Sequence, residues 1–287
     1  MKFGLYFANA GPFAQPATFE ALVRNADEVG FESLWAVEHV VIPAGYESQY
    51  PYSKEGRIPG PEDNPISDPL IALGYAAALS SRLRLATGIL ILPQRHPFYV
   101  AKEIATIDLL SNGRAILGVG IGWLEEEFEA LGIPFRERAA RTEESIRAIR
   151  SLWKPGADSF EGDFNRWKPV HSSPRPVQEP GPPIVIGGHV EGAARRAARY
   201  GDGFFPAKGG LGRLPQLFDV IRAECAEIGR DPSEIELTAS AAGTDLDTIK
   251  RYRDIGVSRL VMAPPGFDPD GIARGLEAFG NDVLAKL

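Results

Sequence analysis

The stretch LATGILIL at residues 85–92 has no charged side chain, and a second apolar run, PPIVIG, stands at residues 182–187. Strands that are apolar on both faces are typical of a parallel sheet covered by helices on both sides. A sheet with one face in water would instead alternate polar and apolar residues. These two runs therefore predict an α/β protein built on a parallel sheet.

Apolar runs of this kind alternate along the chain with segments of helical periodicity. Residues 19–29, for example, place apolar side chains at helical spacing and are followed by Gly30, a residue type that often ends helices. We predict strands at residues 2–8, 33–37, 83–92, 115–119, 183–186, 203–206, 235–239 and 258–262, each followed by helical segments. Eight such units favour a (β/α)8 TIM barrel over a six-stranded doubly wound sheet, in one domain spanning residues 1–287.

Two connections are longer than the usual loops of about 2–6 residues between strands and helices. Residues 40–67 form an insertion after the second strand, and residues 155–182 form one before the fifth strand. The first insertion lies at the C-terminal mouth of the barrel, where active sites of this architecture occur. We interpret residues 43–67, with Tyr46, Tyr50 and Tyr52, as a substrate lid rather than a plain surface loop. For the second insertion, a crossing between barrel faces and a surface excursion both remain open.

Composition excludes several classes of protein. The net charge is −7 and no basic block is present, which argues against nucleic acid as a partner. No apolar run is long enough to span a membrane, and the N-terminal residues lack a secretion signal, so we expect a cytoplasmic protein. Cys225 is the single cysteine, and the four histidines include no pair at i, i+4 spacing. We therefore predict no metal site.

Histidine and glutamate follow the second strand directly. His39 occupies a position where barrel enzymes place catalytic groups, and imidazole exchanges protons near neutral pH. The alternative is a histidine that only hydrogen-bonds the lid. Glu38 is expected on the other side of the strand, either at the edge of a cofactor or at the base of the lid. His96 precedes Pro97 at a helix start and is interpreted as a structural or rim residue.

Glycines gather at two strand ends. Gly118, Gly120 and Gly122 close the fourth strand, where bare backbone permits close approach of a ligand or of another segment. Gly187, Gly188 and His189 stand between a strand and a helix, and the amides of a helix N-terminus favour anions, so we predict a phosphate site there. Trp123 follows the first cluster and either walls a ring system or packs in the loop. Lys208 and Arg213 either meet a negatively charged tail or lie on the surface.

The segments SLWAVEHV, LRLATGILILPQRHP, LSNGRAILGVGIGWLEEEFEALG and PPIVIGG occur in an order that closely resembles the bacterial luciferase-like flavin- and deazaflavin-dependent oxidoreductases. The form GxGxGWxxxEFEALG is similar to the F420-dependent branch. The resemblance implies a tricyclic cofactor in the barrel mouth, with its phosphate at Gly187–His189. It also implies a cis peptide between Gly88 and Ile89, after Thr87 and beneath the ring, and a homodimer.

The resemblance further places His39 near the reactive carbon of a deazaflavin. The family's sugar-phosphate dehydrogenases carry a proton-transferring glutamate where this chain has Trp123, which favours a more apolar substrate. We therefore predict an F420-dependent oxidoreductase that transfers a hydride between the deazaflavin and a medium-sized, partly hydrophobic molecule. One alternative is an FMN-dependent monooxygenase that uses O2 and receives reduced flavin from a separate reductase. Another is a flavin-binding protein without catalysis.

Overall fold

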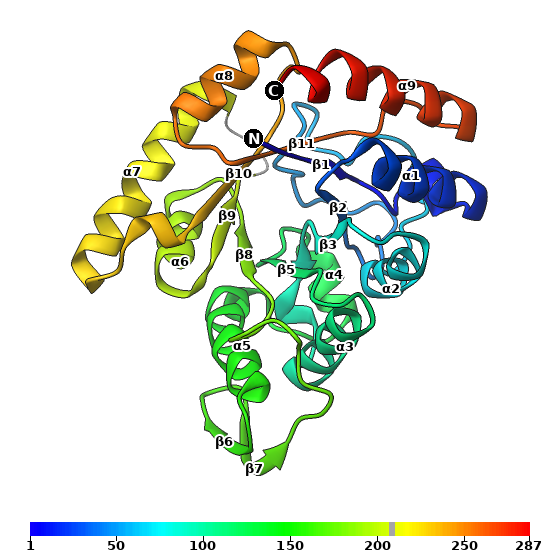
Figure 1. The fold of residues 1–287 in the computed structure, drawn as a ribbon. Helices are drawn as coiled ribbons and strands as arrows, with labels where there is room; N and C mark the ends of the chain where they lie inside the picture. The colour runs from blue at the N-terminus through cyan, green and yellow to red at the C-terminus, as the bar shows by residue number, and fades with distance from the viewer. Residues whose placement is uncertain (207–209) are drawn as a thin grey trace.

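The computed structural model describes residues 1–206 and 210–287, so Lys208 lies outside the described residues. The barrel strands are β1 (Lys2–Tyr6), β2 (Ser33–Ala36), β3 (Arg84–Thr87), β4 (Leu90–Ile91), β5 (Ala115–Gly120), β8 (Ile184–Gly187), β9 (Gly203–Phe205), β10 (Glu236–Ser240) and β11 (Arg259–Met262). They pair in the order β3-β2-β1-β11-β10-β9-β8-β5-β4, and pairing of β3 with β5 closes the sheet (Figure 1). β3 and β4 together form the third predicted strand, so these strands correspond to the eight predicted ones. The predicted parallel (β/α)8 barrel is therefore confirmed.

Apolar side chains pack on both sides of the strands, as the continuous apolar runs predict. A small cluster fills the barrel interior and consists of Trp35, Ala86, Ile116, Val185, Phe205 and Val261. The rings of Trp35 and Phe205 meet edge to face inside the barrel, with centroids 5.2 Å apart. A larger apolar cluster lies between the strands and the surrounding helices.

The helices surround the barrel (Figure 1). They are α1 (Pro16–Val29), α2 (Pro69–Leu79), α3 (Pro97–Leu110), α4 (Glu125–Ala130), α5 (Arg138–Trp153), α6 (Glu191–Tyr200), α7 (Gly210–Ile228), α8 (Leu246–Asp254) and α9 (Pro269–Asp282). Four of them begin at a proline, which fits the first helical turn because it needs no amide hydrogen there. Apolar periodicity places the start of α1 at residue 19, three residues after Pro16, since it detects only the apolar side chains that face the core.

The insertion at residues 155–182 contains an antiparallel hairpin of β6 (Ala157–Glu161) and β7 (Arg166–His171) outside the barrel (Figure 1). Trp167 packs against Phe98 of α3 and Phe160 of β6. The chain then follows α3, where Lys102 donates a hydrogen bond to the carbonyl of Ser173 and Asp108 accepts one from the amide of Gln178. This path along α3 leads into β8 and supports the reading of a crossing between barrel faces.

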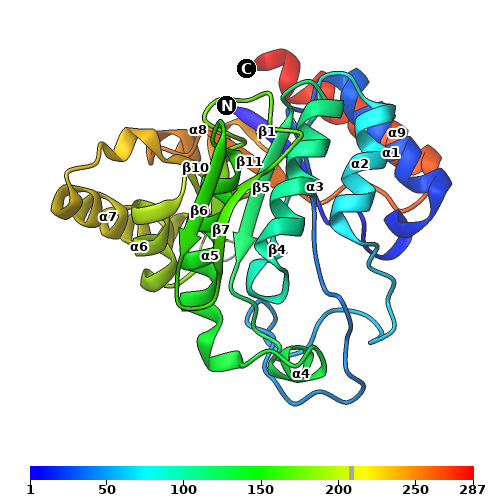
Figure 2. The same cartoon turned by 90° about the horizontal axis from the view of Figure 1, so that it is seen from below.

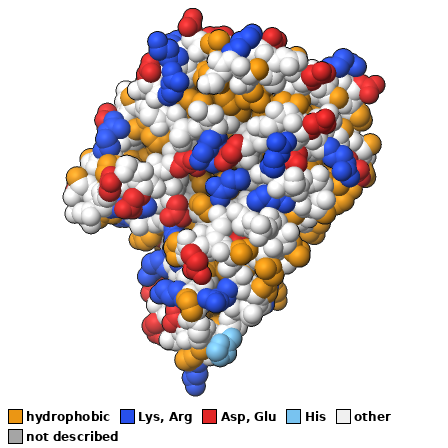
Figure 3. Space-filling view, in the orientation of Figure 1, with side chains coloured by type: hydrophobic (Ala, Val, Ile, Leu, Met, Phe, Trp, Pro, Cys, Tyr) orange, Lys and Arg blue, Asp and Glu red, His pale blue; other side chains and the backbone are white. Residues whose placement is uncertain are grey.

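The insertion after β2 and helix α4 meet at one end of the barrel (Figure 2). On the face shown in Figure 3, basic and acidic side chains are interspersed over the surface. None of the described helices combines the length and the apolar character that a membrane crossing requires.

Candidate active site

His39 is held by a buried carboxylate at the C-terminal end of β2. Its Nδ1 lies 2.9 Å from Oε2 of Glu127 on α4, and the Glu127 side chain is buried. The same carboxylate accepts hydrogen bonds from the amides of Val40 at 2.7 Å and Val41 at 3.3 Å. Because a carboxylate accepts, Nδ1 of His39 carries the proton in this pair. The arrangement leaves Nε2 as the ring nitrogen outside this pair.

Sequence reasoning missed Glu127. It is one of several glutamates in the run EEEFEA of α4, and the one signal that could have singled it out is the motif GxGxGWxxxEFEALG, which fixes Glu127 and leaves Glu125 and Glu126 variable. The helical spacing does place it next to Phe128, which is also buried, but a partner 88 residues away in sequence is not visible in a local pattern. Only the approach of α4 to the end of β2 identifies it.

A second glutamate of α4 binds the backbone of the predicted lid. Oε1 of Glu126 accepts hydrogen bonds from the amides of Glu47 at 2.6 Å and Ser48 at 3.0 Å. Burial opposes ionisation of Glu126, but these bonds and one from the Ser48 side chain outweigh it and lower its pKa to about 2. Glu126 therefore stays ionised at neutral pH and fixes the lid to α4.

Aromatic rings extend across the mouth from His39 to His189. Trp123 contacts His39, Tyr46 and Tyr50, with ring centroids 5.7, 5.6 and 5.1 Å apart respectively. Tyr50 also meets Tyr52, and the Tyr52 ring lies 5.2 Å from that of His189. The structure thus brings the three predicted lid tyrosines together with Trp123 in one apolar group.

Tyr50 is partly buried next to other phenols. Burial, together with the neighbouring phenols of Tyr52, Tyr6 and Tyr46, raises the pKa of Tyr50 to about 12. A neutral phenol is favoured over a phenolate in such surroundings. Tyr46 is buried and accepts a hydrogen bond through its hydroxyl from the amide of Ile58 at 2.9 Å, so the lid is also tied to itself.

Glu38 lies at the base of the lid. Its Oε2 accepts a hydrogen bond from the amide of Ile91 at 2.5 Å, and its Oε1 accepts one from Nε of Arg95 at 2.7 Å. Burial raises the pKa of the Glu38 carboxyl, and Arg95 and the Ile91 amide only partly offset this effect. Both oxygens are engaged within the protein, which favours the structural reading of Glu38 over contact with a cofactor.

The peptide bond between Gly88 and Ile89 is cis, as the resemblance implies. Thr87 donates a hydrogen bond from Oγ1 to the carbonyl of Gly118 at 2.6 Å. The side chain of Ile89 lies against Gly120 and Gly187, where an added Cβ would come within 2.5 and 2.6 Å of it. Packing against Ile89 therefore already requires bare backbone at both glycines, and their contact with a cofactor stays a prediction.

Gly188 and His189 lead into α6, whose N-cap residue Val190 offers no side-chain cap. Gly188 has a φ of +130°, and an added Cβ would lie 2.7 Å from that of Ala193. Amides at an N-terminus without a side-chain cap suit an anion, although the first turn of the helix also carries Glu191. A second close contact occurs at Gly122, which has a φ of +77° and packs on Phe128 and Ile91. These features fit the phosphate and ring of a flavin-type cofactor.

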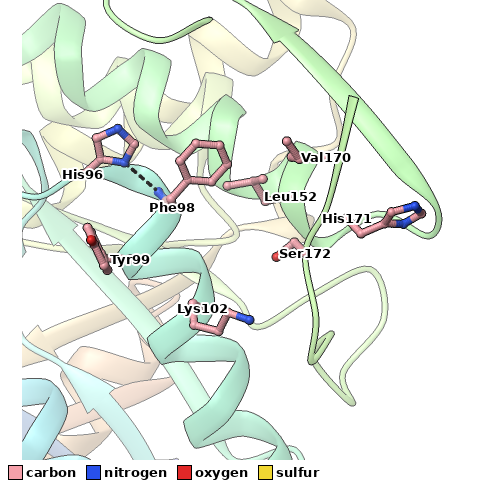
Figure 4. A pocket seen from close by; sticks show the side chains of 8 residues that line it. All are labelled: His96, Phe98, Tyr99, Lys102, Leu152, Val170, His171 and Ser172. Atoms are coloured by element: carbon pink, nitrogen blue, oxygen red, sulfur yellow. Dashed lines mark hydrogen bonds between the residues drawn. The ribbon is translucent and has the colours of Figure 1, made fainter. Parts of the chain in front are cut away.

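The remaining candidates, His96 and Arg213, stand at the starts of α3 and α7. His96 caps α3, because its Nδ1 accepts a hydrogen bond from the amide of Phe98 at 3.2 Å, and so has the structural role expected of it. It lines an open cavity of about 600 Å³ between α3 and the end of β7, together with Phe98, Tyr99, Lys102, Leu152, Val170, His171 and Ser172 (Figure 4).

Arg213 is exposed on α7. Within residues 1–206 and 210–287, no group of three or more His, Cys, Asp or Glu side chains is arranged to hold a metal.

The sequence and the fold are similar to those of known proteins. The model of the luciferase-like monooxygenase family matches residues 1–250. An uncharacterized protein of Mycobacterium tuberculosis (strain ATCC 25618 / H37Rv) is 31% identical over 275 residues, which cover 93% of this chain and 94% of that protein. The FMNH2-dependent dimethylsulfone monooxygenase of Pseudomonas putida is 30% identical over 265 residues, covering 91% and 65% respectively. The coenzyme F420-dependent tetrahydromethanopterin reductase of Methanopyrus kandleri superposes with a TM-score of 0.77 at 19% identity, covering 99% of both chains.

The sheet is a closed parallel barrel, and a long insertion and several polar residues lie at its C-terminal mouth. The protein is therefore a (β/α)8 barrel whose candidate site is at that mouth. The chain belongs to the luciferase-like monooxygenase family, whose model covers most of its length. The family predicted from the sequence motifs is thereby confirmed.

Proposed function

We propose that this protein is an F420-dependent oxidoreductase that transfers a hydride between the deazaflavin and a medium-sized, partly hydrophobic organic substrate. The observation that carries the proposal is the pair of His39 and buried Glu127 at the barrel mouth, 2.9 Å apart. Hydride transfer to a carbonyl or from an alcohol requires a proton donor or acceptor beside it. A histidine with one ring nitrogen held by a carboxylate performs this role.

The residues present fit a flavin-type group. The amides near Gly188 and His189 would hold its phosphate, and Ile89, after the cis peptide, would support its ring. When bound, F420 supplies a ring carbon that accepts or gives a hydride. We propose that Trp123 stands beside this ring.

The chain's own residues perform the rest of the chemistry. Glu127 keeps the proton on Nδ1 of His39, so that Nε2 gives or takes the proton of the substrate oxygen. The lid tyrosines and Trp123 exclude water and present apolar surface to the substrate. Trp123 stands where a proton-transferring glutamate is expected in sugar-phosphate dehydrogenases, which supports a substrate without a sugar phosphate.

A second candidate function is an FMN-dependent monooxygenase, which the similarity to the dimethylsulfone monooxygenase of Pseudomonas putida favours. Such an enzyme would use O2 and would need a separate flavin reductase as a partner. The two functions are distinguished by dissociation constants measured with the purified protein for F420 and for reduced FMN. Tight binding of F420 and weak binding of FMN supports our proposal, and the reverse order overturns it.

We also propose that the protein is a cytoplasmic homodimer that associates through α2. This helix contains no charged residue, and Leu70, Leu73 and Ala76 face the core. Its outer side nevertheless exposes Ile71, at 77%, and Tyr75, at 44%. A helix that is apolar all round is normally buried, so a second copy of the chain is the expected cover.

A further inference from the structure

The segment that we interpret as the lid leaves the barrel after Glu38 and returns at Asp68. Asn9, a buried residue after β1, connects the two ends. Its Nδ2 donates hydrogen bonds to the carbonyls of Val37 at 2.8 Å and Ser67 at 2.6 Å. Its Oδ1 accepts one from the amide of Val37, and its backbone carbonyl accepts one from the amide of Ser67. The side chain of Asn9 therefore holds the start and the end of the segment together.

Arg95 connects the same two ends one residue further along. Its Nε donates to Oε1 of Glu38 at 2.7 Å, and its guanidinium pairs with Oδ2 of Asp68 at 2.5 Å. The other oxygen of Asp68, Oδ1, caps α2 by accepting hydrogen bonds from the amides of Leu70 and Ile71. The planar guanidinium suits this double contact, because it presents several donors in a fixed fork.

These contacts surround His39 in the sequence. Asn9 holds Val37 through both backbone groups, Arg95 and the Ile91 amide hold Glu38, and Glu127 holds the amide of Val40. The backbone on each side of His39 is thus fixed independently of the imidazole itself. Because Glu38 directly precedes His39, a displacement of the Glu38 backbone would also displace the His39 imidazole.

We propose that Asn9 and Arg95 are positioning residues: they clamp both ends of the lid to the barrel rim and thereby set the place of His39 opposite Glu127. The inference rests on the proposed function, because it assigns the clamp to the group that moves the proton.

The decisive variant is Asp68→Asn. Asparagine caps helices as well as aspartate does, so the bonds to Leu70 and Ile71 survive. The amide nitrogen would instead face the guanidinium of Arg95, where two donors meet and the pair is lost. Asp268→Asn is the matched control, since Asp268 caps α9 through a bond to Gly271 and lies far from the lid in sequence. Neither variant changes a residue that we place in catalysis.

Two measurements without any cofactor test the clamp. The first is the rate of trypsin cleavage after Lys54 and Arg57 in the lid, identified by mass spectrometry. We expect Asp68→Asn to accelerate it about tenfold, as for loss of one hydrogen bond between charged groups, and Asp268→Asn to leave it unchanged. The second is the proton NMR signal of His39 Nδ1–H, assigned with His39→Gln. We expect faster solvent exchange of this proton in Asp68→Asn only.

The outcomes separate the possibilities. Unchanged cleavage and unchanged exchange in Asp68→Asn overturn the proposal. Faster cleavage with an unchanged His39 signal also overturns it, because the clamp would then anchor the lid without positioning the histidine. Should Asp68→Asn fail to fold, Arg95→Lys provides the test, since one ammonium cannot reproduce the forked contact to both carboxylates. Failure to bind F420 would overturn the proposed function while leaving both measurements valid.

Discussion

Tyr52, in the insertion after β2, meets His189, the residue that leads from β8 into α6, edge to face at a centroid distance of 5.2 Å. The two residues lie far apart in the chain and follow β2 and β8, which are not neighbours in the barrel. Their contact shows that the insertion crosses the mouth and reaches the glycines predicted to bind phosphate. The segment interpreted as the lid, the catalytic candidate His39 and the proposed phosphate site are thus connected by ring contacts, and the following predictions address them one by one.

Replacing Glu127 with glutamine should lower kcat about 100-fold or more, because the glutamine amide donates to Nδ1 and forces the wrong tautomer of His39. The dissociation constant of F420 should not change. Turnover is followed through the change in F420 absorbance. Glu129→Gln, at an exposed position of the same helix, is the control and should keep full activity. Equal activity of both variants would show that the carboxylate does not orient the histidine.

Gly188→Ala should weaken F420 binding about tenfold if the proposed phosphate site at the start of α6 holds the cofactor. Gly188 has a φ of +130°, and a Cβ there would meet Ala193 at 2.7 Å, so the turn must shift. Gly192→Ala, in the first turn of the same helix, has open space around the new methyl group. It should raise stability by about 0.5–1 kcal/mol and preserve affinity. Titration calorimetry with F420 and thermal unfolding measure the two effects, and equal affinities would argue against a phosphate site here.

Tyr50→Phe should reduce the loss of stability at high pH. The pKa of Tyr50 is raised to about 12 in the folded protein, above its ordinary value of 10.0. The stabilisation from this shift is fully present below pH 10 and is lost as pH rises toward about 12. Between about pH 9 and about pH 11, the wild type should therefore lose about 1 kcal/mol more unfolding free energy than the variant. Urea titrations at both values test this, and parallel losses would contradict the buried position of Tyr50.

Ile71→Glu should convert the proposed homodimer into a monomer, because the change places a charge on the exposed apolar side of α2. Sedimentation velocity reports the mass of the particle. Leu246→Glu is the control, since Leu246 is also exposed but starts α8, where a negative charge is favourable. A wild-type protein that sediments as a monomer, or a variant that stays a dimer, would exclude this interface.

Several of the site residues were predictable from the sequence because they follow strands directly. In a parallel barrel all strands end at the same mouth, so His39, Trp123 and Gly188 are expected at that mouth whatever the conformation of the loops. Their partners were not predictable. Glu127 belongs to a run of similar glutamates, and Arg95 and Asn9 carry no local pattern that signals a clamp. Glu38 was expected at either the cofactor or the lid, and only its contacts with Arg95 and Ile91 favour the lid.

The sequence by itself determined the eight strand segments of the parallel barrel and the family, since apolar periodicity and strand-end motifs are local properties, but it did not predict the hairpin of β6 and β7. It also placed the long insertion at the mouth. Only the tertiary structure decided which carboxylate holds His39, why Gly120 and Gly187 must lack side chains, and how Tyr52 reaches His189. These are contacts between segments far apart in the chain, and they depend on side-chain packing that no single stretch of residues encodes.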